Sequence, residues 1–225
     1  MRRNLPRIGL FGGTFNPVHL GHLRAAEEVR EILGLHSVYF IPAYMPPHKD
    51  TTGIASPVDR LKMLALATQG NPFFRISDVE LNRGGSSYTI DTLEYFSFTF
   101  PDSELYFVLG SDLFSEIDTW RDYKRLFESS NFAVIMRPGF CNDFSSLCPL
   151  ALKDEFRYYK LENGIITYLH KSSKVLQLVQ IDGIQISSTR IRELIKEYKS
   201  IKYLVPNEVE SYIQTKKLYA QEEHQ

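Results

Sequence analysis

The chain has 225 residues, of which 43% are hydrophobic and 24% charged, and these values are those of a folded globular protein rather than a disordered chain. Its 26 Lys and Arg residues against 27 Asp and Glu give a net charge of −1, so no basic excess favours nucleic acid as a partner. The length predicts a single domain over residues 1–225.

Short apolar runs and amphipathic segments alternate along residues 8–136. In chain order the pattern predicts a strand at 8–11, a helix at 20–33, a strand at 38–41, a helix at 57–68, a strand at 73–76, a helix at 89–96, a strand at 105–109, a helix at 123–127 and a strand at 132–136. Short strands that alternate with helices are typical of a parallel sheet with helices on both faces, which binds ligands at the carboxyl ends of its strands.

The pattern weakens over residues 139–180, which we interpret as an insertion or a mobile region. Within this segment a helix is predicted over 151–160 and a strand over 175–181. Two further helices are expected over 188–198 and 206–218. We therefore predict an α/β fold, with a doubly wound parallel sheet and a small C-terminal helical part.

The cysteines and apolar runs indicate the compartment. Cys141 and Cys148 are too few for a disulfide scaffold and predict reduced thiols. No apolar run approaches the ~20 residues that a membrane span needs, and the run at 8–11 is too short for the core of a secretory signal. We expect a cytoplasmic protein with neither a membrane nor a nucleic-acid partner, and the sequence does not indicate its oligomeric state.

The sequence GGTFNPVHLGH at residues 12–22 joins the first predicted strand to the first predicted helix. The two leading glycines allow close approach of backbone to a ligand, and a helix N-terminus favours anions. His19 and His22 are three residues apart and face the same way on a helix, while Gly21 leaves room for a flat ring or a sugar. We interpret the segment as a phosphate site with two charge-stabilising imidazoles. An ordinary turn is the alternative. A zinc site on the two histidines is disfavoured, because the sequence offers no third ligand clustered with them.

A second motif, ISSTRIR at residues 186–192, opens a late predicted helix. Ser and Thr are favoured helix N-caps, so plain capping beside solvated arginines is one interpretation. Hydroxyls, helix N–H groups and an arginine also suit a triphosphate. A second phosphate cradle formed by Ser188, Thr189 and Arg192 is therefore the other interpretation.

These two motifs resemble the (H/T)xGH and ISSTxIR signatures of the nucleotidylyltransferase superfamily, and they occur in the same order. The superfamily includes the class I aminoacyl-tRNA synthetases, but this chain is short, is not basic and has no KMSKS-like loop. The small adenylyl- and cytidylyltransferases therefore remain. The resemblance implies a Rossmann-like sheet of the nucleotidylyltransferase type.

Three further segments resemble the bacterial nicotinate-nucleotide adenylyltransferases: PPHK at 46–49, SYTIDTL at 87–93 and GSDLFSEIDTW at 110–120. Tyr44 stands where many relatives carry Asn. The resemblance implies transfer of AMP from ATP to nicotinate mononucleotide, which gives deamido-NAD and pyrophosphate in NAD biosynthesis. Mg²⁺ would accompany ATP and offset the charge of the triphosphate.

The resemblance also implies roles for individual residues. His19, His22 and Lys49 would stabilise the reacting phosphates. The residues expected to bind ATP are Gly12, Gly13, Thr14, Phe15, His22, Lys49, Ser188, Thr189 and Arg192. The residues expected to bind the mononucleotide are Tyr88, Thr89, Asp112, Trp120 and Arg137.

The mononucleotide residues have chemical reasons for these roles. The helix start at Tyr88 and Thr89 would favour the nicotinate carboxylate, and Asp112 would accept hydrogen bonds from ribose hydroxyls. Trp120 would stack on the pyridine ring, with core burial as the alternative. Arg137 would pair with the phosphate, with an ordinary surface position as the alternative.

Three other functions fit parts of the sequence. Pantetheine-phosphate adenylyltransferases share the histidine and Ser-Thr motifs, but they lack the SYTxDTL and Trp segments. A nicotinamide mononucleotide adenylyltransferase would prefer an amide to a carboxylate. A module that binds ATP without transferring it would not need His19, His22, Lys49 and Arg192 together.

Overall fold

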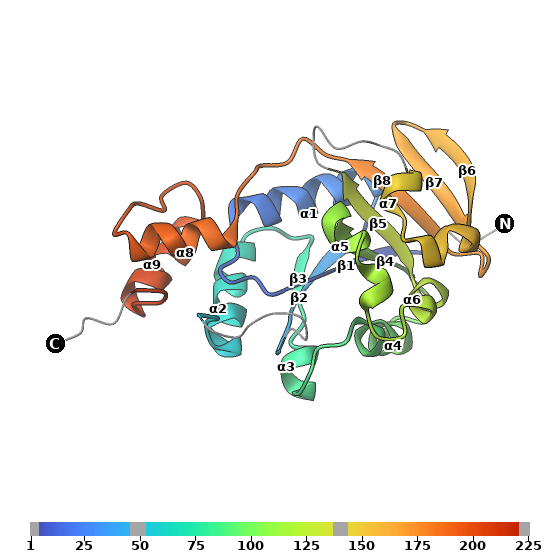
Figure 1. Cartoon of the computed structure of the whole chain (residues 1–225). Helices are drawn as coiled ribbons and strands as arrows, with labels where there is room; N and C mark the ends of the chain where they lie inside the picture. The colour runs from blue at the N-terminus through green and yellow to red at the C-terminus, as the bar shows by residue number, and fades with distance from the viewer. Residues whose placement is uncertain (1–4, 46–52, 137–143, 221–225) are drawn as a thin grey trace.

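The computed structural model describes residues 5–45, 53–136 and 144–220, and one eight-stranded sheet runs through it (Figure 1). The strands are β1 (Arg7–Gly13), β2 (Ser37–Pro42), β3 (Phe74–Ile76), β4 (Glu104–Gly110), β5 (Asn131–Met136), β6 (Phe156–Glu162), β7 (Ile165–His170) and β8 (Val175–Gln180). Their order is β3-β2-β1-β4-β5-β8-β7-β6. The pairs from β3 to β8 are parallel, and β7 and β6 add an antiparallel edge.

Helices cover both faces of the sheet. They are α1 (Leu20–Leu33), α2 (Pro57–Thr68), α3 (Val79–Arg83), α4 (Thr89–Thr99), α5 (Ser111–Phe114), α6 (Tyr123–Ser129), α7 (Phe144–Leu147), α8 (Ser188–Lys196) and α9 (Asn207–Thr215), with 3₁₀ turns at Ile117–Thr119 and Leu150–Glu155. Two apolar cores result, one on each face of the sheet. On β4 the residues alternate, so that Leu105, Phe107 and Leu109 enter one core while Tyr106 and Val108 enter the other.

The prediction of a doubly wound sheet is confirmed. From β1 the chain builds outward through β2 to β3, and then returns to place β4 on the other side of β1. The strand order therefore switches between β1 and β4, where the carboxyl ends of parallel strands leave room for a ligand. Every strand and helix expected over residues 8–136 is present, with boundaries that differ by a few residues. The helices α3 and α5 were not predicted, because five and four residues are too few to show a period.

The helix predicted over 151–160 was wrong. Leu150–Glu155 forms a 3₁₀ turn and Phe156–Glu162 is strand β6, which pairs with β7, a strand that the sequence did not predict. The aromatic run Phe156, Tyr158 and Tyr159 fits a pleated surface, and pairing with β7 outweighs the local helical preference. Part of the irregular 139–180 segment is therefore an antiparallel extension of the sheet.

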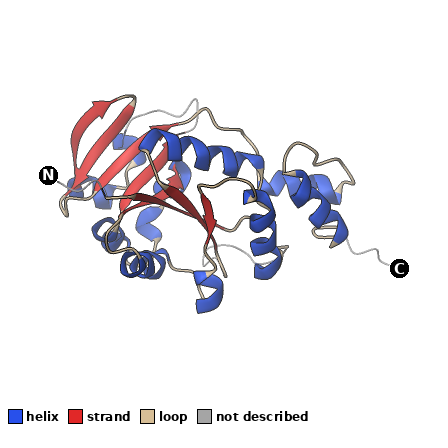
Figure 2. Ribbon diagram, turned by 180° about the vertical axis from the view of Figure 1, so that it is seen from behind, coloured by secondary structure: helices blue, strands red, loops and turns tan. Residues whose placement is uncertain are grey.

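The C-terminal helices lie at the end of the molecule opposite the β6–β7 hairpin, as both views show (Figure 1 and Figure 2). Helix α9 and the segment between α8 and α9 contact the first two helices of the chain. The backbone N–H of Leu20, at the start of α1, donates to Leu204 O at 3.0 Å, and the Tyr212 hydroxyl donates to Asp59 Oδ1 on α2 at 2.8 Å. The predicted C-terminal helical part is thus present and is fastened beside the β1–α1 loop. Across the described ranges, no helix combines the length and apolar character required to span a membrane.

Candidate active site

The β1–α1 loop carries both histidines. His19 is the N-cap of α1 and His22 is its third residue, and the backbone N–H of each donates to Nδ1 of the other at 3.3 Å. The rings stack with 3.6 Å between centroids and 22° between planes, so they face the same way, as their spacing predicts. Because Nδ1 accepts in both rings, each neutral imidazole carries its hydrogen on Nε2. Nε2–H is therefore the hydrogen-bond donor of each neutral ring.

Three carbonyl oxygens of this loop are paired with side chains from distant segments. Thr14 O accepts from Arg60 at 2.9 Å, Asn16 O accepts from Arg192 at 2.8 Å, and Pro17 O accepts from the Ser188 hydroxyl at 2.9 Å. Arg192 also donates to Thr189 Oγ1 at 3.2 Å, and Ser187 caps α8 by accepting from Arg190 N at 3.4 Å. The late Ser-Thr motif therefore packs directly on the histidine loop.

Two residues of α1 hold the segment that precedes α8. A Cβ on Gly21 would lie 2.7 Å from Ile184 O, so only glycine allows this approach. Two turns further along the same face of α1, the buried Glu28 carboxylate accepts from the backbone N–H of Asp182 at 2.7 Å and of Gly183 at 3.1 Å. Protein backbone thus occupies the position that a side chain at residue 21 would need, while Gly21 itself lines the cavity described next.

A cavity of about 560 Å³ lies between these segments. The predicted residues that line it are Gly12, Gly13, Thr14, Phe15, His19, His22, Asp112, Ser188, Thr189 and Arg192. Residues 181–187 also line the cavity, as do Asn16 and Gly21 of the histidine loop. The structure therefore brings together the described members of the predicted ATP set and one member of the mononucleotide set.

Tyr88, Thr89 and Trp120 do not line this cavity. Tyr88 and Trp120 pack against the same apolar core, which includes Ile90 and Leu93 of α4, and we refer to the three residues as the α4 cluster. Tyr88 is the N-cap of α4, and the Arg121 guanidinium lies over its ring at 4.6 Å. The partly buried Trp120 packs edge-to-face on Phe107 of β4, with ring centroids 6.2 Å apart. The Phe107 ring also lies 3.6 Å from the position of an added Cβ on Gly12, so the same ring contacts Trp120 and lies next to a residue that lines the cavity.

Two of the predicted residues, Lys49 and Arg137, lie outside the described residues. Cys141 does as well, whereas Cys148 is buried and reduced. Burial raises the pKa of the Cys148 thiol to about 12, so it is not a reactive nucleophile.

Arg60 is a functional candidate that the sequence analysis missed. Its side chain is fully buried, and besides Thr14 O it donates to Ala55 O and Tyr44 O, each at 3.1 Å. Burial lowers the pKa of the guanidinium, while Tyr219 and Glu80 oppose this shift. Its place at helical spacing before the buried Met63 and Leu64 was the signal that could have located it on the inner face of α2.

Glu80 is a second buried ionisable residue, and its side chain is hydrogen-bonded to the first turns of α4. This buried carboxylate accepts from the Thr92 hydroxyl at 2.6 Å, one turn inside α4. Burial raises its pKa, against the lowering effect of hydrogen bonds from Thr92 and Ser87. Ser87 Oγ also accepts from Tyr44 N at 2.9 Å, which ties the segment before α4 to the loop after β2.

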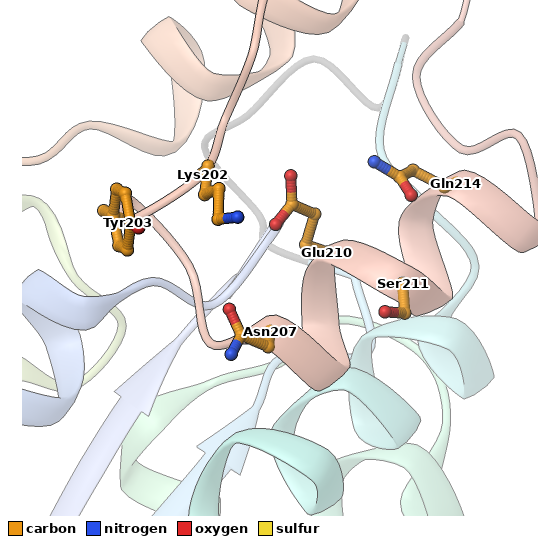
Figure 3. Close-up of a pocket in the computed structure, with 6 residues that line it drawn as sticks. All are labelled: Lys202, Tyr203, Asn207, Glu210, Ser211 and Gln214. Carbon is orange, nitrogen blue, oxygen red and sulfur yellow. The ribbon is translucent and has the colours of Figure 1, made fainter.

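A second hollow of about 480 Å³ lies on the surface beside α9 (Figure 3). Its lining is polar and comprises Lys202, Tyr203, Asn207, Glu210, Ser211 and Gln214. It contains no residue of either motif.

Comparison with known proteins shows the family to which the chain belongs. The cytidylyltransferase-like family model matches residues 10–194, so the chain belongs to this family of nucleotidyltransferases. A relative from Geotalea uraniireducens is 44% identical over 95% of this chain and 98% of its own length. A relative from Pelobacter propionicus is 43% identical over 96% of this chain and 99% of its own length. Each is named "Probable nicotinate-nucleotide adenylyltransferase". Within the family, the chain is one of the nicotinate-nucleotide adenylyltransferases.

A solved structure shows the same fold. The nicotinic acid mononucleotide adenylyltransferase of Plasmodium falciparum, described as complexed with NaAD, matches with a TM-score of 0.72 at 20% identity, over 95% of this chain and 97% of that chain. The predicted Rossmann-like fold of the nucleotidylyltransferase type is confirmed.

Gly21→Ala is expected to destabilise the protein by about 1–3 kcal/mol, because the new methyl group would overlap with Ile184 O and force the 182–187 segment away from α1. Thermal and urea unfolding measure the effect. Gly12→Ala is the matched control, since its added methyl group meets only the Phe107 ring at 3.6 Å. Equal stability of the Gly21 variant and the wild type would contradict the close approach.

Proposed function

We propose that this chain transfers AMP from ATP to nicotinate mononucleotide, which yields deamido-NAD and pyrophosphate in NAD biosynthesis. The observation that carries the proposal is the single cavity shared by His19, His22 and the Ser188–Arg192 turn, in a chain over 40% identical to proteins named for this reaction. A phosphate oxygen of the mononucleotide attacks the α-phosphorus of ATP, and the bond from that phosphorus to the bridging oxygen breaks as pyrophosphate leaves.

The two imidazoles supply hydrogen-bond donors where charge develops on the transferred phosphoryl group. Their Nδ1 atoms are held by the reciprocal cap, which fixes the ring orientation and leaves Nε2–H as the donor of each ring. A phosphate is ionised at neutral pH and needs no general base. Catalysis then comes from positioning and charge stabilisation.

Ser188, Thr189 and Arg192 hold the triphosphate tail and the leaving pyrophosphate. Arg192 has five N–H donors, and its bonds to Asn16 O and Thr189 engage only two of its nitrogens, so it can hold the loop and a phosphate together. Mg²⁺ enters as part of the MgATP substrate and offsets negative charge on the triphosphate. Lys49 adds positive charge from the loop after β2.

The cluster around α4 receives the mononucleotide. The N-terminus of α4 at Tyr88 and Thr89 favours the nicotinate carboxylate, and Trp120 offers an aromatic surface to the pyridine ring. Asp112, on the cavity wall, accepts from ribose hydroxyls, and Arg137 pairs with the phosphate. We place the reaction in the cytoplasm.

Pyrophosphate release from MgATP tests the proposal with three acceptors offered separately: nicotinate mononucleotide, nicotinamide mononucleotide and phosphopantetheine. We expect release to be fastest with nicotinate mononucleotide, together with deamido-NAD as product. Preference for one of the other acceptors would assign the corresponding adenylyltransferase instead. ATP binding without pyrophosphate release from any acceptor would indicate a non-catalytic nucleotide-binding module.

His22→Ala is expected to lower kcat by at least ~10²-fold, because one donor to the reacting phosphate is removed. The substitution also removes half of the cap at the start of α1, which costs about 1 kcal/mol of stability. Thermal unfolding therefore accompanies the kinetics, and turnover is compared well below the unfolding temperature. A folded variant with the wild-type kcat would exclude His22 from the chemistry.

Trp120→Ala is expected to raise the KM for nicotinate mononucleotide more than the KM for ATP, since the lost indole belongs to the α4 cluster rather than to the cavity. Trp120→Phe serves as the control, because it retains an aromatic ring and should fall between the wild type and the Ala variant. A larger change in the KM for ATP would refute the stacking role.

A further inference from the structure

Asn16 lies at the centre of a buried polar cluster under the histidine loop. Its side chain is 4% exposed and makes three hydrogen bonds. Oδ1 accepts from Ala55 N at 2.9 Å and from the Tyr219 hydroxyl at 2.7 Å, while Nδ2 donates to Gly53 O at 3.2 Å. A residue inside the first motif is thus joined both to the segment before α2 and to the segment that follows α9.

Arg60 closes the same cluster from the opposite side. It donates to Ala55 O at 3.1 Å and to Thr14 O at 2.9 Å, so both backbone groups of Ala55 are engaged, one through Arg60 and one through Asn16. We refer to Asn16, Ala55, Arg60 and Tyr219 as the Asn16 cluster. It connects the loop after β1 to the start of α2 without involving either imidazole.

Tyr219 reaches this cluster in a strained backbone conformation. Helix α9 ends in a turn in which Leu218 N donates to Ile213 O at 3.0 Å, and Tyr219 then takes a φ of +66°. Left-handed backbone costs an aromatic residue about 1 kcal/mol or more, and it persists where the surrounding structure holds it. Burial raises the pKa of the Tyr219 phenol above its usual range, which moves its ionisation still further from neutral pH.

We propose that Tyr219 is a positioning residue for the transfer reaction, whose hydroxyl fixes Asn16 and thereby sets the place of the imidazoles of His19 and His22. This inference rests on the proposed function. Asn16 stands three residues before His19, and its carbonyl is already held by Arg192. Tyr219 holds the side chain of the same residue, so the two bonds fix Asn16 at both ends.

The physical reason for an effect on rate is geometric. Without the Tyr219 hydroxyl, Asn16 Oδ1 retains only the bond from Ala55 N, and the loop gains freedom to move against α2. Displacement of a charge-stabilising donor by about 1 Å costs up to ~10²-fold in rate. Substrate binding depends on many contacts around the cavity and changes less. The signature of a positioning residue is therefore a loss in kcat at nearly constant KM.

The test compares Tyr219→Phe with Tyr212→Phe in the full chain. Each variant loses one hydroxyl that donates to a side chain, at 2.7 Å to Asn16 Oδ1 or at 2.8 Å to Asp59 Oδ1, and each keeps its aromatic ring. For Tyr219→Phe we expect kcat to fall by about tenfold while the KM of each substrate changes by less than about twofold. For Tyr212→Phe we expect kcat within about twofold of the wild type.

Three outcomes would overturn the proposal. The first is an unchanged kcat in a folded Tyr219→Phe variant. The second is an equal loss of kcat in both variants, which would indicate general packing of the C-terminal segment. The third is failure of Tyr219→Phe alone to fold, which would show that the hydroxyl is needed for the fold rather than for the place of the loop.

Hydrogen exchange separates this inference from the proposed function. Loss of the Tyr219 hydroxyl should speed exchange of the Ala55 amide, which donates to Asn16, and should leave the β4 amides unchanged. Unchanged exchange at Ala55 would contradict the inference whatever the activity. A wild-type chain inactive with nicotinate mononucleotide would instead refute the proposed function, while the exchange experiment still decides the role of Tyr219.

Discussion

The β1–α1 loop contains carbonyl oxygens that neither the strand before it nor the helix after it can pair, and the arrangement of the site follows from this. Thr14, Asn16 and Pro17 each need a donor, because a buried carbonyl without one costs about 1–3 kcal/mol. Side chains of α2 and α8 supply these donors. Pairing of these carbonyl oxygens with their donors therefore brings the late Ser-Thr turn to the histidines. The same hydrogen bonds that stabilise the folded loop thus assemble the cavity.

This arrangement changes how anion binding at the start of α1 is understood. A helix N-terminus offers unpaired N–H groups, but here Leu20 N donates to Leu204 O and His22 N donates to His19. These amides already have protein partners. The proposed binding of phosphates therefore depends on side chains that line the cavity, namely the two imidazoles and the guanidinium that α8 contributes.

The sequence predicted elements well where local pattern decides them and poorly where distant pairing decides them. Strands and helices over residues 8–136 have clear periods, and two signatures indicated which loops would meet. The helix expected over 151–160 failed because β6 gains its stability from β7. Arg60 was missed because its partners are carbonyls in two loops, and no sequence pattern shows which carbonyls a fold leaves without donors.

Net charge was a correct guide to the class of partner and a poor guide to the local field. The chain carries −1 overall, yet α2 and α8 bring the guanidiniums of Arg60 and Arg192 to carbonyl oxygens of one loop. Their partners there are neutral, so these bonds satisfy the N–H donors and leave the positive charge in place. Charge in a water-poor site acts over a longer range than the same charge on the surface. Of these two arginines only Arg192 lines the cavity, where Asp112 and Asp182 also stand, so the place of one guanidinium beside the Ser-Thr turn, and not the sum of the lining charges, is what favours a polyphosphate there.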